Sequence, residues 1–305
     1  MFSENGKRMV INGETKVVGL FGDPVSHSFS PAMHNAAFRE RELNFCYLPF
    51  RVRKDDLPAA VRAIASLGLR GVNVTAPHKE AVVPYLDELS PEAGFLKAVN
   101  TIENEEGKLV GYNTDVDGFL YLLQNNLGNV FPLEDAFLLG AGGAAGAVSL
   151  ALAKAGVKSL VVANRTIARA EGLASLLIRG GIFEDGKVSI VKLDKNSLRE
   201  SIESSTLIIN ALSEDPVELG FLPQQNLRGC KAAIDLRYST PLAPFGKWAE
   251  NNGILALNGL DMLLGQGVKA FEIFTGEEAP LRIMKEALQN AFKIGYKPVE
   301  KFFAG

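Results

Sequence analysis

The chain has 305 residues, of which 47% are hydrophobic and 22% charged, and its formal net charge is −3. This length allows one large domain or two ordinary ones, and the composition is that of a globular protein with a sizeable core. The small negative charge argues against a broad surface for nucleic acids or anionic membranes.

The cysteines, histidines and apolar stretches exclude further classes of protein. Cys46 and Cys230 lie far apart, and no histidine shares a metal-ligand spacing with them. Residues 1–16 lack the apolar region of a secretory signal. Residues 140–156 are rich in glycine and contain Lys154, so they make a poor membrane span. We therefore expect a cytoplasmic protein with two reduced thiols and no metal site.

The first third of the chain alternates predicted strands with helices. Ser30 is the predicted N-cap of a helix with Pro31 at its first position. A second, amphipathic helix is predicted to end at Gly68. This alternation is typical of a parallel sheet covered by helices. The predicted strands are 16–25, 44–52 and 70–77, and the second helix is 57–68.

A second alternating pattern begins near residue 135. Residues 135–156 read as strand, glycine loop and helix, and the chain becomes helical from residue 258. Two α/β halves of unlike sequence predict ligand binding in a cleft between them. Further strands are predicted within 159–166, 204–212 and 230–238.

The glycine loop predicts a dinucleotide site. Gly140, Gly142 and Ala145 fit the pattern G-x-G-x-x-A, which permits a tight turn and brings a pyrophosphate close to a helix N-terminus. The alternative is a tight turn with a structural role alone.

The end of the next predicted strand favours NADP(H) over NAD(H). NAD-binding proteins usually place an acidic residue there to hold the ribose 2′-hydroxyl. This chain has Asn164 instead, followed by Arg165 and Arg169. Two guanidinium groups would bind a 2′-phosphate that a carboxylate would repel. Alternatively, both arginines are solvated residues at the start of a helix.

A nicotinamide cofactor implies hydride transfer, so a proton donor is also needed. Lys79 ends a predicted strand in the other half of the chain, although a lysine in such a place is commonly a surface residue. Asp115 would keep the ammonium oriented if the two shared a cleft, although an acid there commonly caps a helix. The sequence thus offers Lys79 and Asp115 as a proton-transfer pair.

Two serines flank one turn at the first predicted helix start. Hydroxyls and exposed N–H groups at a helix N-terminus can hold a carboxylate without an arginine. Capping alone would explain Ser30, but it would not explain the pairing with Ser28.

Seven motifs together resemble the shikimate dehydrogenase family, and they cover nearly the whole chain. In order they are GDPVSHSFSPAMHN (22–35), GVNVTAPHK (71–79), AVNTI (98–102), GYNTDVDG (111–118), GAGGAAG (140–146), NRT (164–166) and GLDMLLGQG (259–267).

The resemblance implies a reaction and a fold. The reaction is the reversible NADPH-dependent reduction of 3-dehydroshikimate to shikimate, a step toward chorismate and the aromatic amino acids. The fold is a two-domain α/β protein with an N-terminal substrate domain, whose sheet is mostly parallel, and a Rossmann-type NADP domain. The substrate domain comprises residues 1–117 together with 258–305, and the NADP domain comprises 118–257.

The resemblance also assigns roles to the matching residues. Lys79 and Asp115 are the catalytic pair. Ser28 and Ser30 are expected to bind the substrate carboxylate. Thr75, Asn100 and Gln266 are expected to bind ring hydroxyls, and Tyr238 is expected to lie close to the substrate. The expected cofactor contacts are Gly140, Gly142, Gly143, Ala144, Ala145, Asn164, Arg165, Thr166, Arg169 and Gly259. The expected partner is a small-molecule substrate, with no nucleic acid or membrane, and the protein is a monomer or a homodimer.

Five places depart from the family pattern. Ala76 stands where a bulkier aliphatic is common, Lys97 where glycine is usual, and Phe274 where tryptophan is frequent. Leu212 replaces the threonine of Asn-Ala-Thr, and the stretch DLRYSTPL (235–242) is shorter than usual. The last two fall where the nicotinamide is expected, so they concern the cofactor side more than the class of reaction.

Three alternatives stay open. A quinate/shikimate dehydrogenase would accept a substrate with an extra hydroxyl, but Ser28, Ser30 and the NRT motif favour the biosynthetic NADP enzyme. A non-catalytic ligand sensor on the same fold is disfavoured by the intact Lys79 and Asp115. Another Rossmann reductase, such as one acting on an acyl-tRNA, would need a basic docking surface, which the net charge does not support.

Overall fold

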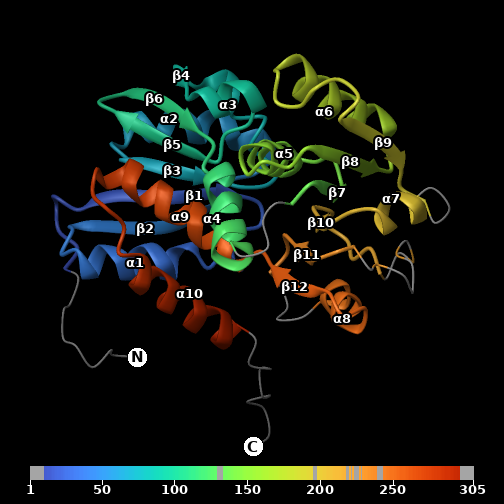
Figure 1. Ribbon diagram of the computed structural model, residues 1–305. Coiled ribbons are helices and arrows are strands. Elements are labelled where there is room, and N and C mark those ends of the chain that lie inside the picture. Colours follow the sequence, from blue (N-terminus) through green and yellow to red (C-terminus); the bar gives the residue numbers. More distant parts are fainter. Residues whose placement is uncertain are drawn as a thin grey trace, which may run out of the picture. The chain divides into compact units, whose positions relative to one another are not determined.

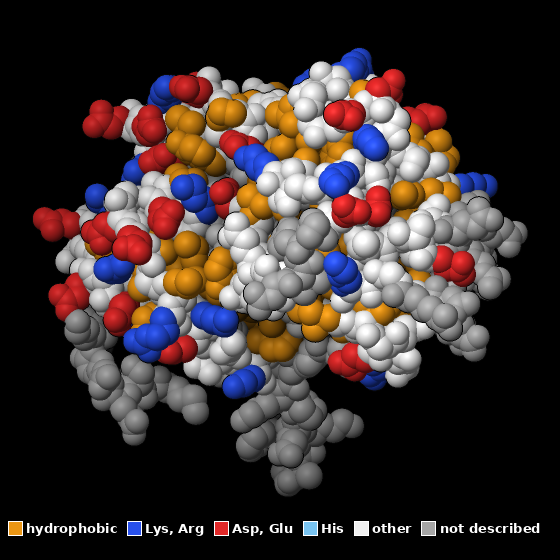
Figure 2. Space-filling view, viewed as in Figure 1, with side chains coloured by type: hydrophobic (Ala, Val, Ile, Leu, Met, Phe, Trp, Pro, Cys, Tyr) orange, Lys and Arg blue, Asp and Glu red, His pale blue; other side chains and the backbone are white. Residues whose placement is uncertain are grey.

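The computed structural model describes residues 10–128, 133–194, 198–217, 220, 222, 227, 229–238 and 243–295. The chain divides into two compact units. The first comprises Met1–Thr114 and Gln266–Gly305, and the second comprises Asp115–Gly265. None of the helices described is both long and apolar enough to cross a membrane. On the face drawn in Figure 2, basic and acidic side chains are interspersed.

The first unit contains a six-stranded sheet in the order β2-β1-β3-β5-β6-β4 (Figure 1). β1 pairs in parallel with β2 and β3, as predicted, whereas β5 and β6 form an antiparallel hairpin beside β3. Its strands are β1 (Lys16–Gly22), β2 (Phe45–Arg51), β3 (Gly71–Val74), β4 (Glu88–Leu89), β5 (Thr101–Glu105) and β6 (Lys108–Tyr112). Its helices are α1 (Ser30–Glu40), α2 (Leu57–Ser66), α3 (Pro91–Leu96) and α10 (Leu281–Gly295), with α9 (Leu260–Thr275) crossing the unit boundary and short 3₁₀ turns η1 (Lys54–Asp56) and η2 (Val83–Tyr85).

The hairpin was not predicted from the sequence. Its two turn residues, Glu106 and Gly107, both have positive φ, at 54° and 101°. Such turns are usually marked by Asn-Gly or Asp-Gly, and Glu-Gly lacks that signal. The Asn104 Oδ1 accepts the Gly107 N–H at 2.7 Å. The asparagine that stabilises this turn therefore lies three residues before the glycine, not directly before it as in Asn-Gly.

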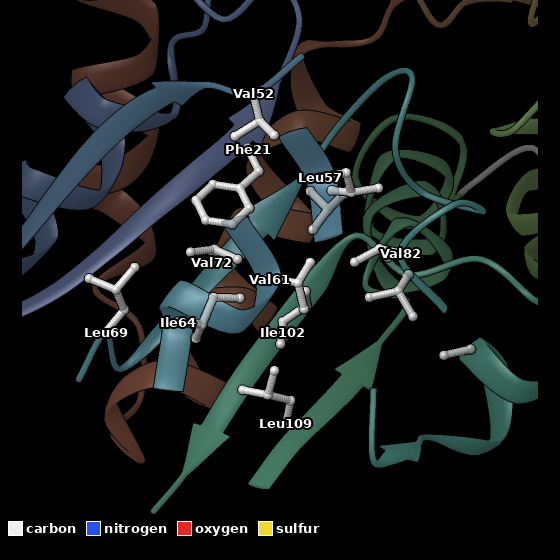
Figure 3. Packing of buried hydrophobic residues seen from close by; sticks show 13 residues of the cluster. Phe21, Val52, Leu57, Val61, Ile64, Leu69, Val72, Val82, Ile102 and Leu109 are labelled. Carbon is white, nitrogen blue, oxygen red and sulfur yellow. The ribbon is translucent and has the colours of Figure 1, made fainter. Parts of the chain in front are cut away.

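Apolar residues fill both faces of the first sheet. On one face, Leu57, Val61 and Ile64 of α2 are spaced to form a stripe, and they pack on strand residues such as Val72 and Ile102 (Figure 3). On α1, buried Phe38 lies against the Phe271 ring of α9, with centroids 5.4 Å apart, and α1 also contacts α10. These contacts fix α1, which begins at the predicted site residue Ser30, and α9, which contains Gln266.

The second unit contains a six-stranded parallel sheet in the order β12-β11-β10-β7-β8-β9. This is the Rossmann strand order, so the predicted α/β class and Rossmann-type domain are confirmed. Its strands are β7 (Asp135–Leu139), β8 (Ser159–Asn164), β9 (Val188–Lys192), β10 (Leu207–Asn210), β11 (Ala232–Asp235) and β12 (Leu255–Asn258). Its helices are α4 (Asp115–Leu127), α5 (Ala145–Lys154), α6 (Ile167–Arg179), α7 (Arg199–Glu203) and α8 (Pro244–Asn251).

The order of chain connection reverses between β7 and β10, which are neighbours at the centre of this sheet. In open parallel sheets, ligands bind beyond the carboxyl ends of the strands at such a reversal. The glycine loop follows β7 and the Leu212 segment follows β10, so both predicted cofactor-side segments begin at this place.

Candidate active site

The strand register of the first sheet brings the predicted substrate segments to a single edge. Phe21 of β1 lies beside Val74 of β3, and Thr101 of β5 lies between Asn73 and Tyr112. The chain leaves or enters the sheet at these residues. The loops that carry Ser28, Ser30, Thr75, Lys79 and Asn100 therefore extend from the same edge.

The loop that carries Lys79 is held at four points. Thr75 donates its N–H to the Phe21 carbonyl at 2.9 Å, and Ala76 accepts the Asp23 N–H at 3.1 Å. The buried His78 ring contacts the Val52 carbonyl through Nε2 at 2.7 Å, and the Lys79 carbonyl accepts the Val99 N–H at 2.8 Å. Lys79 is half-buried.

One expectation about this loop was wrong. β3 ends at Val74, five residues before Lys79, so Lys79 does not end a strand. The intervening turn instead places the Lys79 backbone against Val99, beside Asn100. Two predicted site residues are thereby brought close together in space.

The orientation of the Asn100 amide is fixed by its neighbours. The Thr114 backbone N–H, which can only donate, lies 2.7 Å from one amide atom, which must therefore be Oδ1. The Asn100 Nδ2 then donates to the Thr114 Oγ1 at 2.9 Å. Thr114 therefore holds the Asn100 amide in a single orientation.

A buried polar network extends from Asn100 through the sheet. The Tyr47 hydroxyl donates to the Asn73 Oδ1 at 2.8 Å, and the Asn73 Nδ2 donates to the Thr101 Oγ1 at 2.9 Å. Thr101 in turn donates to the Asn100 Oδ1 at 3.2 Å. This network could not be predicted from the sequence, because Tyr47 and Asn73 come from different strands and resemble ordinary strand residues.

The predicted N-cap at Ser30 is corrected by the structure. α1 begins at Ser30, and Phe29 occupies the N-cap without a side-chain hydrogen bond. A turn closed by the Ser28 N–H and the Val25 carbonyl places the Ser28 Oγ where it accepts the Ser30 N–H at 3.2 Å. Ser28 and Ser30 are thus held together, and capping does not account for the Ser30 hydroxyl.

Gln266 lies on α9 next to a close helix contact. A Cβ on the following residue, Gly267, would stand 2.2 Å from the Met33 Cε of α1, so glycine lets the helices approach. Nearby, the His34 ring is fully buried and stacks on Tyr47, with centroids 4.6 Å apart. Burial lowers the pKa of His34 to about 3, so this histidine is neutral and belongs to the core rather than to a metal site.

Asp115 is buried and is the first residue of α4. It directly follows Thr114, whose N–H and hydroxyl hold Asn100. The network around Asn100 therefore fixes the backbone immediately before the predicted catalytic acid.

The glycine loop of the second unit has the geometry that a dinucleotide requires. Gly140 has a φ of +107°, and a Cβ there would lie 3.1 Å from the Ala211 carbonyl oxygen. Gly142 and Gly143 are exposed, with open space where a Cβ would stand, and α5 begins at Ala145 after an N-cap at Ala144 that forms no side-chain hydrogen bond. A pyrophosphate can therefore approach the helix N-terminus.

Asn164 ends β8, where an acid would specify NAD, and it braces the glycine loop. Its Oδ1 accepts the Ala141 N–H at 3.3 Å, and its Nδ2 donates to the Thr166 carbonyl at 2.9 Å. Arg165 and Arg169 are both exposed beyond this strand. Arg165 forms an ion pair with Glu214 at 3.5 Å, which is too exposed to hold the guanidinium strongly. The residues present thus fit a cofactor with a 2′-phosphate.

The segments after β10, β11 and β12 also converge beside the glycine loop. The Leu212 Cδ2 lies 3.3 Å from the place a Gly140 Cβ would take, and a Cβ on Gly259 would lie 2.1 Å from the Leu236 carbonyl oxygen. Gly259 is therefore required by close packing. Tyr238 is half-buried after β11, and residues 239–242 of the shortened stretch lie outside the described residues.

Within the described residues, no group of three or more histidine, cysteine or acidic side chains is placed to hold a metal ion. Cys46 is buried, Cys230 is half-buried, and both are free thiols.

Comparisons with known proteins agree over most of the chain. Residues 20–102 match the shikimate dehydrogenase substrate binding domain, residues 123–217 match shikimate / quinate 5-dehydrogenase, and residues 259–289 match the shikimate 5′-dehydrogenase C-terminal domain. A shikimate dehydrogenase (NADP(+)) of Desulforamulus reducens is 44% identical over 92% of this chain and 97% of its own length.

Solved structures give the same result. A shikimate dehydrogenase in complex with NADP+ is 37% identical, with a TM-score of 0.82, and the match covers 93% of this chain and 98% of that one. A shikimate 5-dehydrogenase from Thermus thermophilus in complex with NADP(H) and shikimate is 36% identical, with a TM-score of 0.76, over 90% of this chain and 99% of that one.

Proposed function

The chain belongs to the shikimate dehydrogenase family, and we propose that it catalyses the reversible NADPH-dependent reduction of 3-dehydroshikimate to shikimate. The observation that carries this proposal is the 44% identity to an NADP+ shikimate dehydrogenase across 92% of the chain. The protein is then an oxidoreductase that acts on a CH–OH group with NADP(H), in the route to chorismate and the aromatic amino acids.

The proposal divides the chain by role. Residues 1–117 together with 258–305 bind substrate, and residues 118–257 bind NADP(H). The Rossmann strand order and the position of the glycine loop support the second assignment. The gathering of Ser28, Thr75 and Asn100 on loops from one sheet edge supports the first.

Substrate recognition follows from the chemistry of these loops. Ser28 and Ser30, at the start of α1, bind the substrate carboxylate with hydroxyl and N–H donors. Thr75, Asn100 and Gln266 bind ring hydroxyls. Tyr238 lies close to the substrate in this proposal.

The chemistry needs a hydride and a proton. NADPH, when bound, supplies the hydride to the carbonyl carbon. Lys79 donates a proton from Nζ to the carbonyl oxygen, so that no alkoxide is left, and it takes the proton back in shikimate oxidation. Asp115 is the partner of Lys79 in this proton transfer. The four-point attachment of the Lys79 loop supports the role, because a proton donor must be held in place.

Cofactor binding falls to the glycine loop and the clamp. The N–H groups at the start of α5, reached through Gly140, Gly142, Gly143, Ala144 and Ala145, hold the pyrophosphate. Asn164, Arg165, Thr166 and Arg169 bind the adenosine 2′-phosphate, and Gly259 lies on the nicotinamide side.

The proposal also covers the cellular location and the oligomeric state. We place the protein in the cytoplasm, a placement that its free thiols support. A monomer and a homodimer both remain predictions for the assembled state.

The test is an assay of reduced-nicotinamide absorbance with shikimate and with quinate, each with NADP+ and with NAD+. We expect turnover largely confined to shikimate with NADP+. Turnover that prefers quinate or NAD+ would keep the family and overturn the assigned specificity. A folded protein that binds NADPH but turns over no pair would point to the ligand sensor.

A further inference from the structure

Arg237 lies between two buried carboxylates at the carboxyl edge of the second sheet. Its Nε and one terminal nitrogen donate to the two oxygens of Asp235, at 3.0 and 2.6 Å. The same terminal nitrogen donates to the Asp215 Oδ2 at 2.6 Å. The carboxylate side chains are 4% and 3% exposed, whereas that of Arg237 is 22% exposed, so the cluster is closed on the acidic side.

Both carboxylates receive further donors. The Asp235 Oδ1 accepts the Asn210 Nδ2 at 3.0 Å, and Asp215 accepts the N–H groups of Val217 at 2.9 Å and Phe245 at 3.2 Å. Arg237 is the cation that pairs with both carboxylates. These contacts raise the pKa of Arg237 above its ordinary value.

The cluster joins the two segments that are expected beside the nicotinamide. Leu212 lies between Asn210 and Asp215, and its N–H donates to the Asn210 Oδ1 at 3.1 Å. Tyr238 directly follows Arg237. Leu212 also lies next to the glycine loop, at the reversal between β7 and β10.

We propose that Arg237 is a positioning residue for the nicotinamide half of NADP(H), which acts by tying the Leu212 segment to the Tyr238 segment through Asp215 and Asp235. The inference rests on the proposed function. Both departures from the family pattern, Leu212 and the shortened stretch after Tyr238, adjoin this cluster. The ionic contacts hold these two segments together where the chain is shorter than the family pattern.

An arginine is needed for this role. Its planar guanidinium contacts both oxygens of Asp235 while sharing a nitrogen with Asp215, whereas a lysine offers one ammonium group. Arg237→Lys therefore keeps the positive charge and removes the planar group that contacts both carboxylates. Asp215→Asn is the milder second variant, because it keeps the Arg237–Asp235 pair and weakens the contacts of Asp215 with Arg237 and with one of its backbone donors, Val217 or Phe245.

The experiment compares two ligands. NADPH reports on the whole site, and 2′,5′-ADP reports on the adenosine half alone. For Arg237→Lys we expect the NADPH dissociation constant to rise about tenfold, as for a weakened charge-assisted hydrogen bond, with that of 2′,5′-ADP changed less than about twofold. Asp215→Asn should shift the same ratio in the same direction by a smaller factor.

Kinetics and a matched control separate positioning from general destabilisation. In Arg237→Lys, kcat for shikimate oxidation should fall, and the primary isotope effect with deuterium at the transferred position should rise as hydride transfer becomes slower. Arg70→Lys is the control, because Arg70 forms a comparable partly buried pair with Glu103 at 2.6 Å in the other unit. The control should leave both dissociation constants unchanged.

Two outcomes overturn the proposal. One is an equal loss of NADPH and 2′,5′-ADP affinity, which would show a structural role alone, and the other is a folded Arg237→Lys with unchanged NADPH affinity. If Arg237→Lys does not fold, an unchanged affinity ratio in Asp215→Asn overturns it. A wild-type protein that binds NADPH without oxidising shikimate would refute the proposed function, and the affinity ratio would still decide the role of Arg237.

Discussion

The two sheets carry different polar chemistry at their carboxyl edges. In the first unit Asn100 is hydrogen-bonded to the neutral hydroxyls of Thr101 and Thr114. In the second unit the buried groups are ionic, with Arg237 between Asp215 and Asp235. Each of these networks adjoins loops that carry proposed site residues.

The difference teaches what each kind of network can fix. In a neutral network amide oxygens accept and amide nitrogens donate, so the contacts with Thr114 hold the Asn100 amide in one orientation. An ionic cluster fixes backbone segments more firmly, but it depends on every partner. Removing one member costs about 3–5 kcal/mol in a buried ion pair and about 1–3 kcal/mol in a neutral hydrogen bond.

The largest effect is expected at Lys79, whose backbone carbonyl accepts the Val99 N–H beside Asn100 in the first unit. Lys79→Ala should lower kcat by orders of magnitude while leaving much of the substrate affinity, because the lost group acts mainly in the transition state. Steady-state kinetics with shikimate and NADP+ measure this, with the exposed Lys54→Ala as control. A large rise in KM at unchanged kcat would make Lys79 a binding residue.

A second test concerns the clamp on the cofactor side. Arg165→Ala should weaken NADPH binding by about 1–3 kcal/mol, since a charge-assisted contact is lost, and should leave NADH binding unchanged. Glu214→Gln should act in the opposite direction, because it removes the carboxylate that pairs with Arg165. Equal loss of NADPH and NADH binding in Arg165→Ala would refute the assignment of the clamp.

The neutral network itself is tested at Thr114. Thr114→Val keeps the shape and the backbone N–H that contacts the Asn100 Oδ1, but it removes the hydroxyl that accepts from the Asn100 Nδ2, so the amide is held less firmly. We expect kcat/KM for shikimate to fall roughly 5- to 30-fold, which corresponds to a loss of about 1–2 kcal/mol of transition-state stabilisation. Thr114→Ser should restore activity. If valine and serine behave alike, the hydroxyl does not orient Asn100.

Much of the fold of the second unit could be predicted from the sequence, because local patterns indicate it. The strand, glycine loop and helix at 135–154 and the absence of an acid at Asn164 needed only short windows of residues. β9 and β12 were missed because both strands are short and incompletely buried, which leaves a weak apolar pattern.

The two networks could not be predicted, for a different reason. Tyr47 and Asn73 are 26 residues apart, and Asp215 and Arg237 are 22 residues apart, so only the strand pairing brings them together. Arg237 alone reads as a charged residue after a strand. The Ser30 cap failed because Ser28, two residues earlier, takes up the Ser30 N–H.

Protonation offers a smaller test of the first unit. Both ring nitrogens of His34 lack a hydrogen-bond partner among the described residues, and burial lowers its folded-state pKa to about 3 from 6.5. The unfolded chain therefore takes up a proton below pH 6.5 that the folded chain does not. Stability is fully present above 6.5 and is lost as pH falls toward 3.

Between pH 7.5 and 5.5 this difference amounts to about 1.4 kcal/mol. His34→Gln should remove that part of the pH dependence of unfolding in urea, whereas the exposed His27→Gln should leave it as in the wild type. Equal pH dependence in both variants would mean that His34 is protonated in the folded protein.

The smallest effect is expected at Lys97, where the chain turns toward Asn100. Lys97 is the C-cap of α3, with φ 50° and ψ 39°, the left-handed conformation that costs a residue with a side chain about 1–2 kcal/mol. Glycine is usual in the family at this place, and it adopts that conformation freely, although its greater freedom in the unfolded chain offsets part of the gain.

Lys97→Gly should therefore raise the free energy of unfolding by about 0.5–1 kcal/mol, whereas Lys285→Gly, inside α10, should lower it by about 1 kcal/mol. Because the Lys97 side chain is exposed and the backbone need not move, kcat/KM for shikimate should stay unchanged. A gain in stability with lost activity would mean that the strained turn helps to place Asn100. The neutral network would then depend on backbone strain as well as on hydrogen bonds.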